Sequence, residues 1–106
     1  NKEIGRVALM IKDIYYIQSC KHYILYYSEG RDPIKIRGNL SEAEEYFSSF
    51  DFVKIHKSYI VNLRHIFNID KKMDEIIFKQ GFRLNMSKNY KQQVDEKLTE
   101  YLRRTK

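Results

Sequence analysis

One stretch decides the fold: Phe52-Val53-Lys54-Ile55-His56-Lys57-Ser58-Tyr59-Ile60-Val61-Asn62-Leu63. Its two apolar runs, Val53–His56 and Tyr59–Leu63, are rich in the β-branched and aromatic residues that favour strands. Lys57 lies where the first run ends. The stretch therefore predicts two successive strands within a chain made mainly of β-structure.

Further short apolar runs on both sides of this stretch predict additional strands. They lie over Ile4–Ile11, Ile14–Ile17, Tyr23–Tyr27, Ile34–Arg37, Ile66–Ile69, Ile76–Phe78 and Phe82–Met86. Glu29–Pro33 is a turn cluster, so the opening half of the chain predicts a β meander. Gln80 and Gly81 predict a tight hairpin, with Gly81 supplying a positive φ.

Two segments change to helical spacing of their apolar residues. The first spans Asn39–Ser49, where Ser41 and Glu44 have the form of a capping box. The second begins near Ser87 and ends in two arginines, whose charges complement the C-terminal end of a helix dipole. The sequence thus predicts a mainly β (α+β) class, antiparallel, with one internal and one C-terminal helix.

The composition fits one compact domain over residues 1–106, since 42% of the residues are hydrophobic. A single Cys, Cys20, cannot form an internal disulfide, and no Cys/His cluster predicts a metal site, so we expect no cofactor. No apolar run approaches the roughly 20 residues that span a bilayer. Asn1 opens no signal-peptide pattern, so we expect a cytoplasmic protein with an upstream segment before this chain.

The distribution of charge predicts a polyanionic partner. The chain has 20 Lys+Arg against 14 Asp+Glu, a net charge of +6. Carboxylates are absent from four windows, Ile14–Ser28, Pro33–Ser41, Phe52–Ile69 and Ile76–Val94, which hold ten of the cations and all three His. If these windows converge, the domain has a basic face that attracts nucleic acid. The alternative is that core strands simply carry few charges of either sign.

Four motifs together resemble the LytTR DNA-binding domain family. They are Ile14-x-x-Ile17-x-Ser19-x-x-His22-Tyr23, Gly38-Asn39-Leu40, Phe52-Val53-Lys54-Ile55-His56-Lys57-Ser58-Tyr59-Ile60-Val61-Asn62 and Gly81-Phe82-x-Leu84-x-x-Ser87-Lys88-x-Tyr90. The resemblance covers nearly the whole chain in the right order, and the third motif is its most specific element.

The resemblance implies a transcription regulator with an elongated fold of short antiparallel sheets. It implies double-stranded DNA as partner, with loops entering successive major grooves of a direct-repeat site, and a tandem dimer on DNA as one possible arrangement. It also implies a phospho-receiver domain upstream, through which a sensor kinase would act.

The resemblance places the base-contacting positions on His22, Lys57 and Lys88, each at a strand end or helix start and inside a carboxylate-free window. Imidazole can donate to or accept from a base edge, and Lys can reach guanine O6 or N7. Lys88 lies where the family often has Arg, and it lacks the bidentate fork, so a phosphate role is equally open. The residues flanking these positions are the phosphate candidates: Lys21, Ser58, Asn89 and Lys91.

Two further residues of the third motif, His56 and Asn62, are expected to be structural, because such residues usually satisfy buried backbone groups. Two rival functions remain open. A small phosphodiesterase or ribonuclease-like enzyme would use His22, His56 or His65 as acid and base, although no spacing forces these residues together. A protein-interaction module would use the acidic helix Ser41–Ser49 or the terminal helix. We expect DNA binding and no enzymatic activity.

Overall fold

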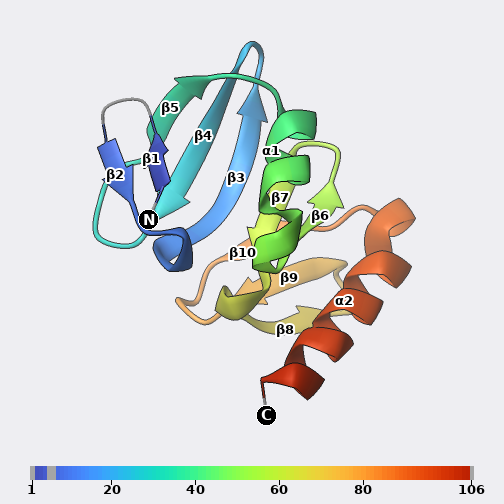
Figure 1. Ribbon diagram of the computed structural model, residues 1–106. Helices are drawn as coiled ribbons and strands as arrows, with labels where there is room; N and C mark the ends of the chain where they lie inside the picture. Colours follow the sequence, from blue (N-terminus) through green and yellow to red (C-terminus); the bar gives the residue numbers. More distant parts are fainter. Residues whose placement is uncertain (1, 5–6, 106) are drawn as a thin grey trace.

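The structure is a computed structural model that describes residues 2–4 and 7–105 (Figure 1). The strands are β1 (Lys2–Ile4), β2 (Val7–Leu9), β3 (Ile14–Cys20), β4 (Tyr23–Ser28), β5 (Ile34–Arg37), β6 (Phe52–His56), β7 (Tyr59–Asn62), β8 (Ile66–Asp70), β9 (Glu75–Phe78) and β10 (Arg83–Asn85). The helices are α1 (Leu40–Phe47) and α2 (Lys91–Arg104), with short 3-10 helices over Ile11–Asp13, Ser48–Phe50, Leu63–His65 and Lys88–Tyr90. The predicted class, mainly antiparallel β with one internal and one C-terminal helix, is confirmed.

A five-stranded antiparallel sheet in the order β5-β4-β3-β7-β6 forms the centre of the domain. The opening meander β3-β4-β5 supplies one side of it. The stretch that decides the fold supplies the other, since β6 and β7 form a hairpin whose second strand pairs with β3, Ile17 opposite Ile60. Residues more than 40 positions apart in the sequence therefore meet at the middle of the sheet.

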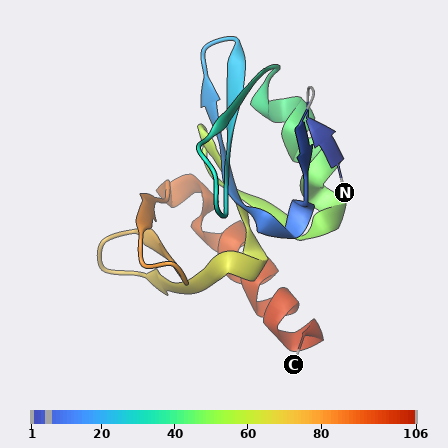
Figure 2. The same cartoon turned by 90° about the vertical axis from the view of Figure 1, so that its left-hand side faces the viewer.

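Each face of this sheet has its own core. Helix α1 packs on one face through Leu40, Ala43 and Phe47, which join a cluster with Ile17 and Ile60. The opposite face of β6 and β7 is covered by the three-stranded sheet β10-β9-β8 and by α2, whose Val94 is fully buried. Figure 2 shows α1 and the three-stranded sheet on opposite sides of the central sheet. The domain measures 38 × 30 × 25 Å, so it is longer in one direction than in the others.

The central sheet has two distinct ends, which matter for function. Because β3 and β6 both run antiparallel to β7, the β3–β4 and β6–β7 turns lie at the same end of the sheet. The starts of β3 and β6 and the end of β7 lie at the other end. That second end, here called the basal end, carries the 3-10 helices Ile11–Asp13, Ser48–Phe50 and Leu63–His65.

Two details of the sequence prediction are wrong. The strand predicted over Ile4–Ile11 is instead the strands β1 and β2, paired antiparallel, followed by a 3-10 helix; residues 5 and 6 lie outside the described part of the chain. The cap of α1 is Asn39, not Ser41: the Asn39 side chain accepts a hydrogen bond from the Glu42 backbone N–H at 2.9 Å and donates one to the Glu42 carboxylate. The N-cap therefore lies two residues earlier than predicted.

The predicted hairpin at Gln80 and Gly81 is confirmed. Gly81 has φ 101° between β9 and β10, a conformation that glycine adopts without strain. The last helix begins close to the predicted position, with a 3-10 turn at Lys88–Tyr90 before α2. Within the described residues, neither α1 nor α2 has the length and apolar character needed to cross a bilayer.

Candidate nucleic-acid interface

Three turns at one end of the central sheet are joined to one another by backbone hydrogen bonds. The Ser19 N–H, just before the β3–β4 turn, donates to the Ser58 carbonyl in the β6–β7 turn at 3.0 Å. The Ser87 N–H, at the entrance to Lys88–Tyr90, donates to the Ile55 carbonyl of β6 at 2.9 Å. Residues 21–22, 57–58 and 87–89, here called the three-turn rim, are thus fixed relative to one another, and Figures 1 and 2 show these segments following one another down one side of the molecule.

The rim presents all three residues that the sequence assigned to base contacts. His22, Lys57 and Lys88 are exposed, one on each turn. Among the residues that the structure describes, none of their side chains forms an ion pair, so the full charge of both lysines faces solvent. The structure therefore places these three side chains on three neighbouring, exposed turns.

The β3–β4 turn has only two residues, Lys21 and His22, between the paired strand ends. Lys21 has φ 58°, in the left-handed region that non-glycine residues seldom adopt. The His22 carbonyl accepts a hydrogen bond from the Gly38 N–H at 3.0 Å, which holds the end of β5 beside the turn. The conformation of this turn is therefore set by contacts on both of its sides.

The β6–β7 turn is organised by His56. The His56 Nδ1 accepts a hydrogen bond from the Ser58 N–H at 3.1 Å, and its ring lies 5.2 Å from the Tyr59 ring. These contacts hold Lys57 at the tip of the hairpin.

The predicted phosphate contacts have different surroundings. Lys21 and Asn89 are exposed, while Ser58 is half-buried and its carbonyl is engaged with Ser19. Lys91 is half-buried, and its Nζ lies 2.8 Å from the Asp74 carboxylate. A phosphate contact by Lys91 would have to compete with that ion pair.

Carboxylates that are distant in sequence neutralise part of the charge expected for the basic face. Arg83 lies 2.8 Å from the Asp70 carboxylate and 3.3 Å from the Glu75 carboxylate. The pKa of Asp70 is lowered, first by the hydrogen bond from the Met73 backbone N–H and then by the hydrogen bond from Arg83. Lys54, which lies in a carboxylate-free window, is 3.9 Å from Glu44 of α1. Segments that contain no carboxylate in the sequence therefore still have carboxylates of other segments next to some of their cations in the fold.

Two cations that the sequence analysis did not single out lie next to the rim. Lys35 and Arg37 project from β5, with the Lys35 Nζ 4.6 Å and the Arg37 guanidinium 6.0 Å from the centre of the Tyr23 ring. Tyr23 directly follows His22, and Arg37 is its partner across the sheet. The signal was present in the sequence, because both cations alternate with apolar residues inside a carboxylate-free window.

The remaining motif residue, Asn62, lies away from the rim at the basal end. It is 3% exposed, its Nδ2 donates to the carbonyls of Ile14 at 3.0 Å and Ile11 at 3.4 Å, and its Oδ1 accepts from the Arg64 N–H at 3.2 Å. These bonds join the end of β7 to the start of β3. Hydrogen bonds to backbone groups of this kind are what the proposed structural role of Asn62 requires.

The three histidines occupy separate places. His65 is buried at the basal end, where its Nε2 donates to the Lys12 carbonyl at 2.6 Å and its Nδ1 accepts from Gln80 at 3.0 Å. Strand β7 separates it from His56 at the turn end. No group of three or more His, Cys, Asp or Glu side chains in the described ranges is arranged to hold a metal ion.

Comparisons with known proteins bear on the family and the fold of the chain. The family described as the LytTr DNA-binding domain matches residues 5–99 of the chain. A search of curated proteins gave no match. Among solved structures, a LytTr DNA-binding domain described as part of a response regulator from Bacillus cereus superposes with a TM-score of 0.76; it is 21% identical and the match covers 87% of this chain and 86% of that one. At this identity the likeness shows a common fold, and the family match over 5–99 shows that the chain belongs to the LytTR family of DNA-binding domains.

Proposed function

We propose that this domain binds double-stranded DNA sequence-specifically, as the DNA-reading part of a transcription regulator, by placing the three-turn rim in successive major grooves. The observation that carries the proposal is the rim itself. His22, Lys57 and Lys88 are exposed on three turns that backbone hydrogen bonds fix to one another. A rigid array of this kind can follow a regular surface such as a duplex.

The dimensions of the rim suit a duplex. The β3–β4 and β6–β7 hairpins are neighbours in the sheet, so their axes are separated by roughly two strand spacings, ~10 Å. The tip of the β3–β4 turn lies at most two residues beyond Ser19, which is level with Ser58, so this turn projects up to about 7 Å further. These separations match the width of one major groove, about 12 Å. Successive major grooves on one face of DNA are about 34 Å apart, so a second groove would have to be reached by the Lys88 turn.

The roles within the rim follow from the chemistry of each side chain. Lys57 would donate to guanine O6 or N7, and His22 would offer one ring nitrogen to a base edge. Lys88 would donate to a base or a phosphate, as a point charge rather than a fork. Non-glycine residues in the left-handed region often occur at functional sites, which supports a phosphate contact by Lys21.

The phosphate contacts would extend on both sides of the rim. On one side we assign phosphate contacts to Ser58, Asn89 and Lys91. Lys91 would give up its ion pair with Asp74 to contact a phosphate. On the other side Lys35 and Arg37 of β5 carry charge without a carboxylate partner among the described residues. Because Lys35 and Arg37 lie beside the His22 turn, they would contact the DNA phosphates along the edge of the groove that His22 enters.

The wider regulatory setting is also part of the proposal. A direct-repeat site would be occupied by two copies in tandem, and a phospho-receiver domain upstream, addressed by a sensor kinase, would control their assembly. We further infer a cytoplasmic location and no enzymatic activity. The phosphodiesterase alternative needs two histidines on one substrate; His65 is buried at the basal end, which leaves His22 and His56, on the two neighbouring turns, as the pair that a cleavage assay must test.

The test is selection of duplexes from a random pool, followed by fluorescence anisotropy with the selected site. Lys57→Ala should weaken binding by about 1–3 kcal/mol, roughly five- to 150-fold, and relax preference at one base position. Uniform weakening on all sequences would reassign Lys57 to a phosphate. The matched control is Lys79→Ala, which removes an exposed charge from the β9–β10 turn beside His65, away from the rim.

Two outcomes would overturn the proposal. The affinity should fall steeply with salt, because log K decreases by about 0.9 per phosphate neutralised for each tenfold rise in salt. A flat salt dependence, or equal loss in Lys79→Ala and Lys57→Ala, would refute placement of the duplex on the rim. Cleavage of labelled RNA or DNA that His22→Ala abolishes would establish the enzyme instead.

A further inference from the structure

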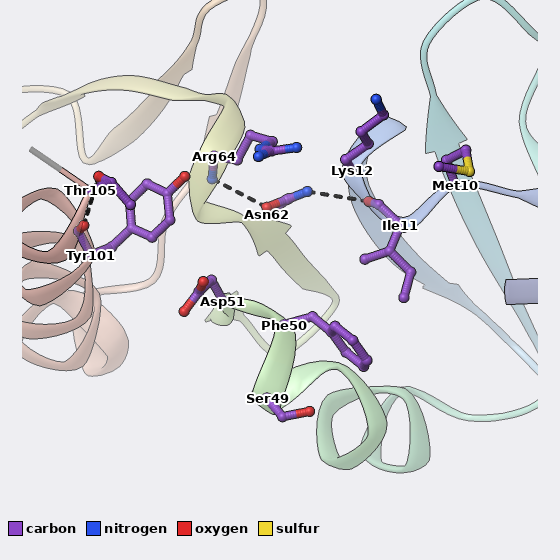
Figure 3. Close-up of a pocket in the computed structure, with 10 residues that line it drawn as sticks. All are labelled: Met10, Ile11, Lys12, Ser49, Phe50, Asp51, Asn62, Arg64, Tyr101 and Thr105. Carbon is purple, nitrogen blue, oxygen red and sulfur yellow. Dashed lines mark hydrogen bonds between the residues drawn. The ribbon is translucent and has the colours of Figure 1, made fainter. Parts of the chain in front are cut away.

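A groove at the basal end lies as far from the three-turn rim as the sheet allows. It has a volume of about 490 Å³, and its walls include Met10, Lys12, Phe50, Asn62, Arg64 and Tyr101. These residues come from the 3-10 turn before β3, the segment before β6, the end of β7 and the last turns of α2. Figure 3 shows them surrounding an open space with Asn62 at its inner wall.

The groove combines unpaired positive charge with exposed apolar surface. Lys12 and Arg64 are exposed, and within the described ranges neither side chain has an ion-pair partner. Figure 3 shows both on one side of the space, with the Phe50 ring on the other. Phe50 and Met10 are 42% and 40% exposed, unusually high for such large apolar side chains.

The one carboxylate in the groove does not cancel this charge. Asp51 accepts from the Arg104 guanidinium at 2.6 Å, so its charge is already balanced by α2. The groove as a whole therefore presents two free cations beside an aromatic ring and a thioether. Arg is suited to bidentate recognition of carboxylate, and Met to contact with apolar groups of varied shape.

The segments that form the groove are held together by hydrogen bonds in which the side chains of Lys12, Arg64, Phe50 and Met10 take no part. Asn62 joins Ile11 and Arg64 through its side chain, and the Thr105 hydroxyl donates to the Tyr101 carbonyl at 2.9 Å (Figure 3). The groove is thus formed in the folded domain before any ligand binds, which lowers the cost of binding.

We propose that this basal groove is a binding site for an acidic peptide segment of another protein, one that carries a large apolar side chain between carboxylates. The carboxylates would pair with Lys12 and Arg64, and the apolar side chain would lie against Phe50 and Met10. Because the groove is at the opposite end of the central sheet from the rim, the domain would hold this segment and DNA at the same time. A DNA-bound copy could thereby recruit a second protein.

The test uses three synthetic probes and the ¹⁵N-labelled domain. The first is a fluorescein-labelled hexapeptide in which two Asp stand on each side of a central Phe-Leu pair; the second replaces each Asp with Lys, and the third replaces Phe-Leu with Ser-Ser. The first should shift the backbone amide signals of Ile11, Asn62 and Leu63, and the other two should bind at least tenfold more weakly. Equal binding of the Ser-Ser peptide would overturn the proposal, since charge alone would then suffice.

Variants separate this site from the rim, which also attracts acidic groups. Arg64→Gln and Phe50→Ser should each weaken the first peptide at least fivefold and leave DNA affinity within twofold. Lys57→Ala should do the reverse. Displacement of the peptide by duplex DNA, or amide shifts confined to residues 21–22, 57–58 and 87–89, would place the peptide on the rim and overturn the proposal whether or not DNA binding is established.

Discussion

Removal of the Asn62 side chain is expected to destabilise the domain without altering the DNA-reading surface. Asn62→Ala removes bonds to the carbonyls of Ile14 and Ile11 and from the Arg64 N–H, at 3.0, 3.4 and 3.2 Å. A net 0.5–1.5 kcal/mol for each bond, with the long one at the low end, gives a loss of about 1.5–3.5 kcal/mol. Domains of this size are stable by about 5–15 kcal/mol, so the variant should still fold in the cold.

The assay is urea unfolding at 15 °C together with a thermal scan. The midpoint in urea should fall at unchanged slope, and the melting temperature should drop by roughly 6–28 °C at about 4–8 °C per kcal/mol. The control is Asn68→Ala, in which an exposed Asn on β8 loses only a local bond to the Ile69 N–H. It should lose less than about 1 kcal/mol.

The DNA affinity of Asn62→Ala at 15 °C decides between a structural and a functional role. Asn62 lies at the basal end, so affinity for the selected duplex should remain within twofold of the parent chain. An unfolding free energy within 1 kcal/mol of the parent, combined with lost DNA binding, would refute the reasoning and make Asn62 part of the interface.

Three further predictions test other parts of the structure. Arg37→Ala should weaken DNA binding on every sequence and reduce the salt slope by about 1 if it contacts one phosphate, whereas a change in base preference would contradict that role. Burial raises the pKa of Tyr16 to about 12, and the neighbouring Tyr27 and Tyr59 add to this shift. Between about pH 10 and 12 the folded state therefore binds more protons than the unfolded state, so the free energy of unfolding falls as the pH rises. In urea unfolding, Tyr16→Phe should lose less stability over this pH range than the parent chain. His56→Ala removes the acceptor for the Ser58 N–H, so amide exchange at Ser58 should accelerate at least tenfold while exchange at Ile14 stays unchanged.

The sequence predicted the elements of this fold better than their connections. Alternation and β-branched runs located nearly every strand, because those patterns reflect local burial. The 3-10 helix at Ile11–Asp13 escaped prediction because the side chain that bonds its Ile11 carbonyl is Asn62, 51 positions away. The cap of α1 was misplaced because Ser41 and Asn39 are both good caps, and only the entry angle of the chain selects Asn39.

The sequence indicated candidate residues for the site, but it did not show the charges that surround them in the fold. The resemblance indicated the positions of His22, Lys57 and Lys88, and the structure places them on one rim. Counting charges along the chain could not show that Lys91 pairs with Asp74 or Arg83 with Asp70, since those contacts form between segments that fold together. The sequence could not show that Lys12 and Arg64 lie together in the basal groove, because that groove also forms only when distant segments fold together.

The stiffness of the rim bears on how much of its contact energy can appear as affinity. A loop that orders on binding spends part of its contact energy on lost conformational freedom, about 1–2 kcal/mol for each residue of backbone fixed. In this domain the bonds from Ser19 to Ser58 and from Ser87 to Ile55 already fix the turns when the chain folds. Contacts by Lys57 and Lys88 would then lose less affinity to backbone ordering than contacts from a loop that orders on binding, while each lysine side chain would still lose rotamer freedom.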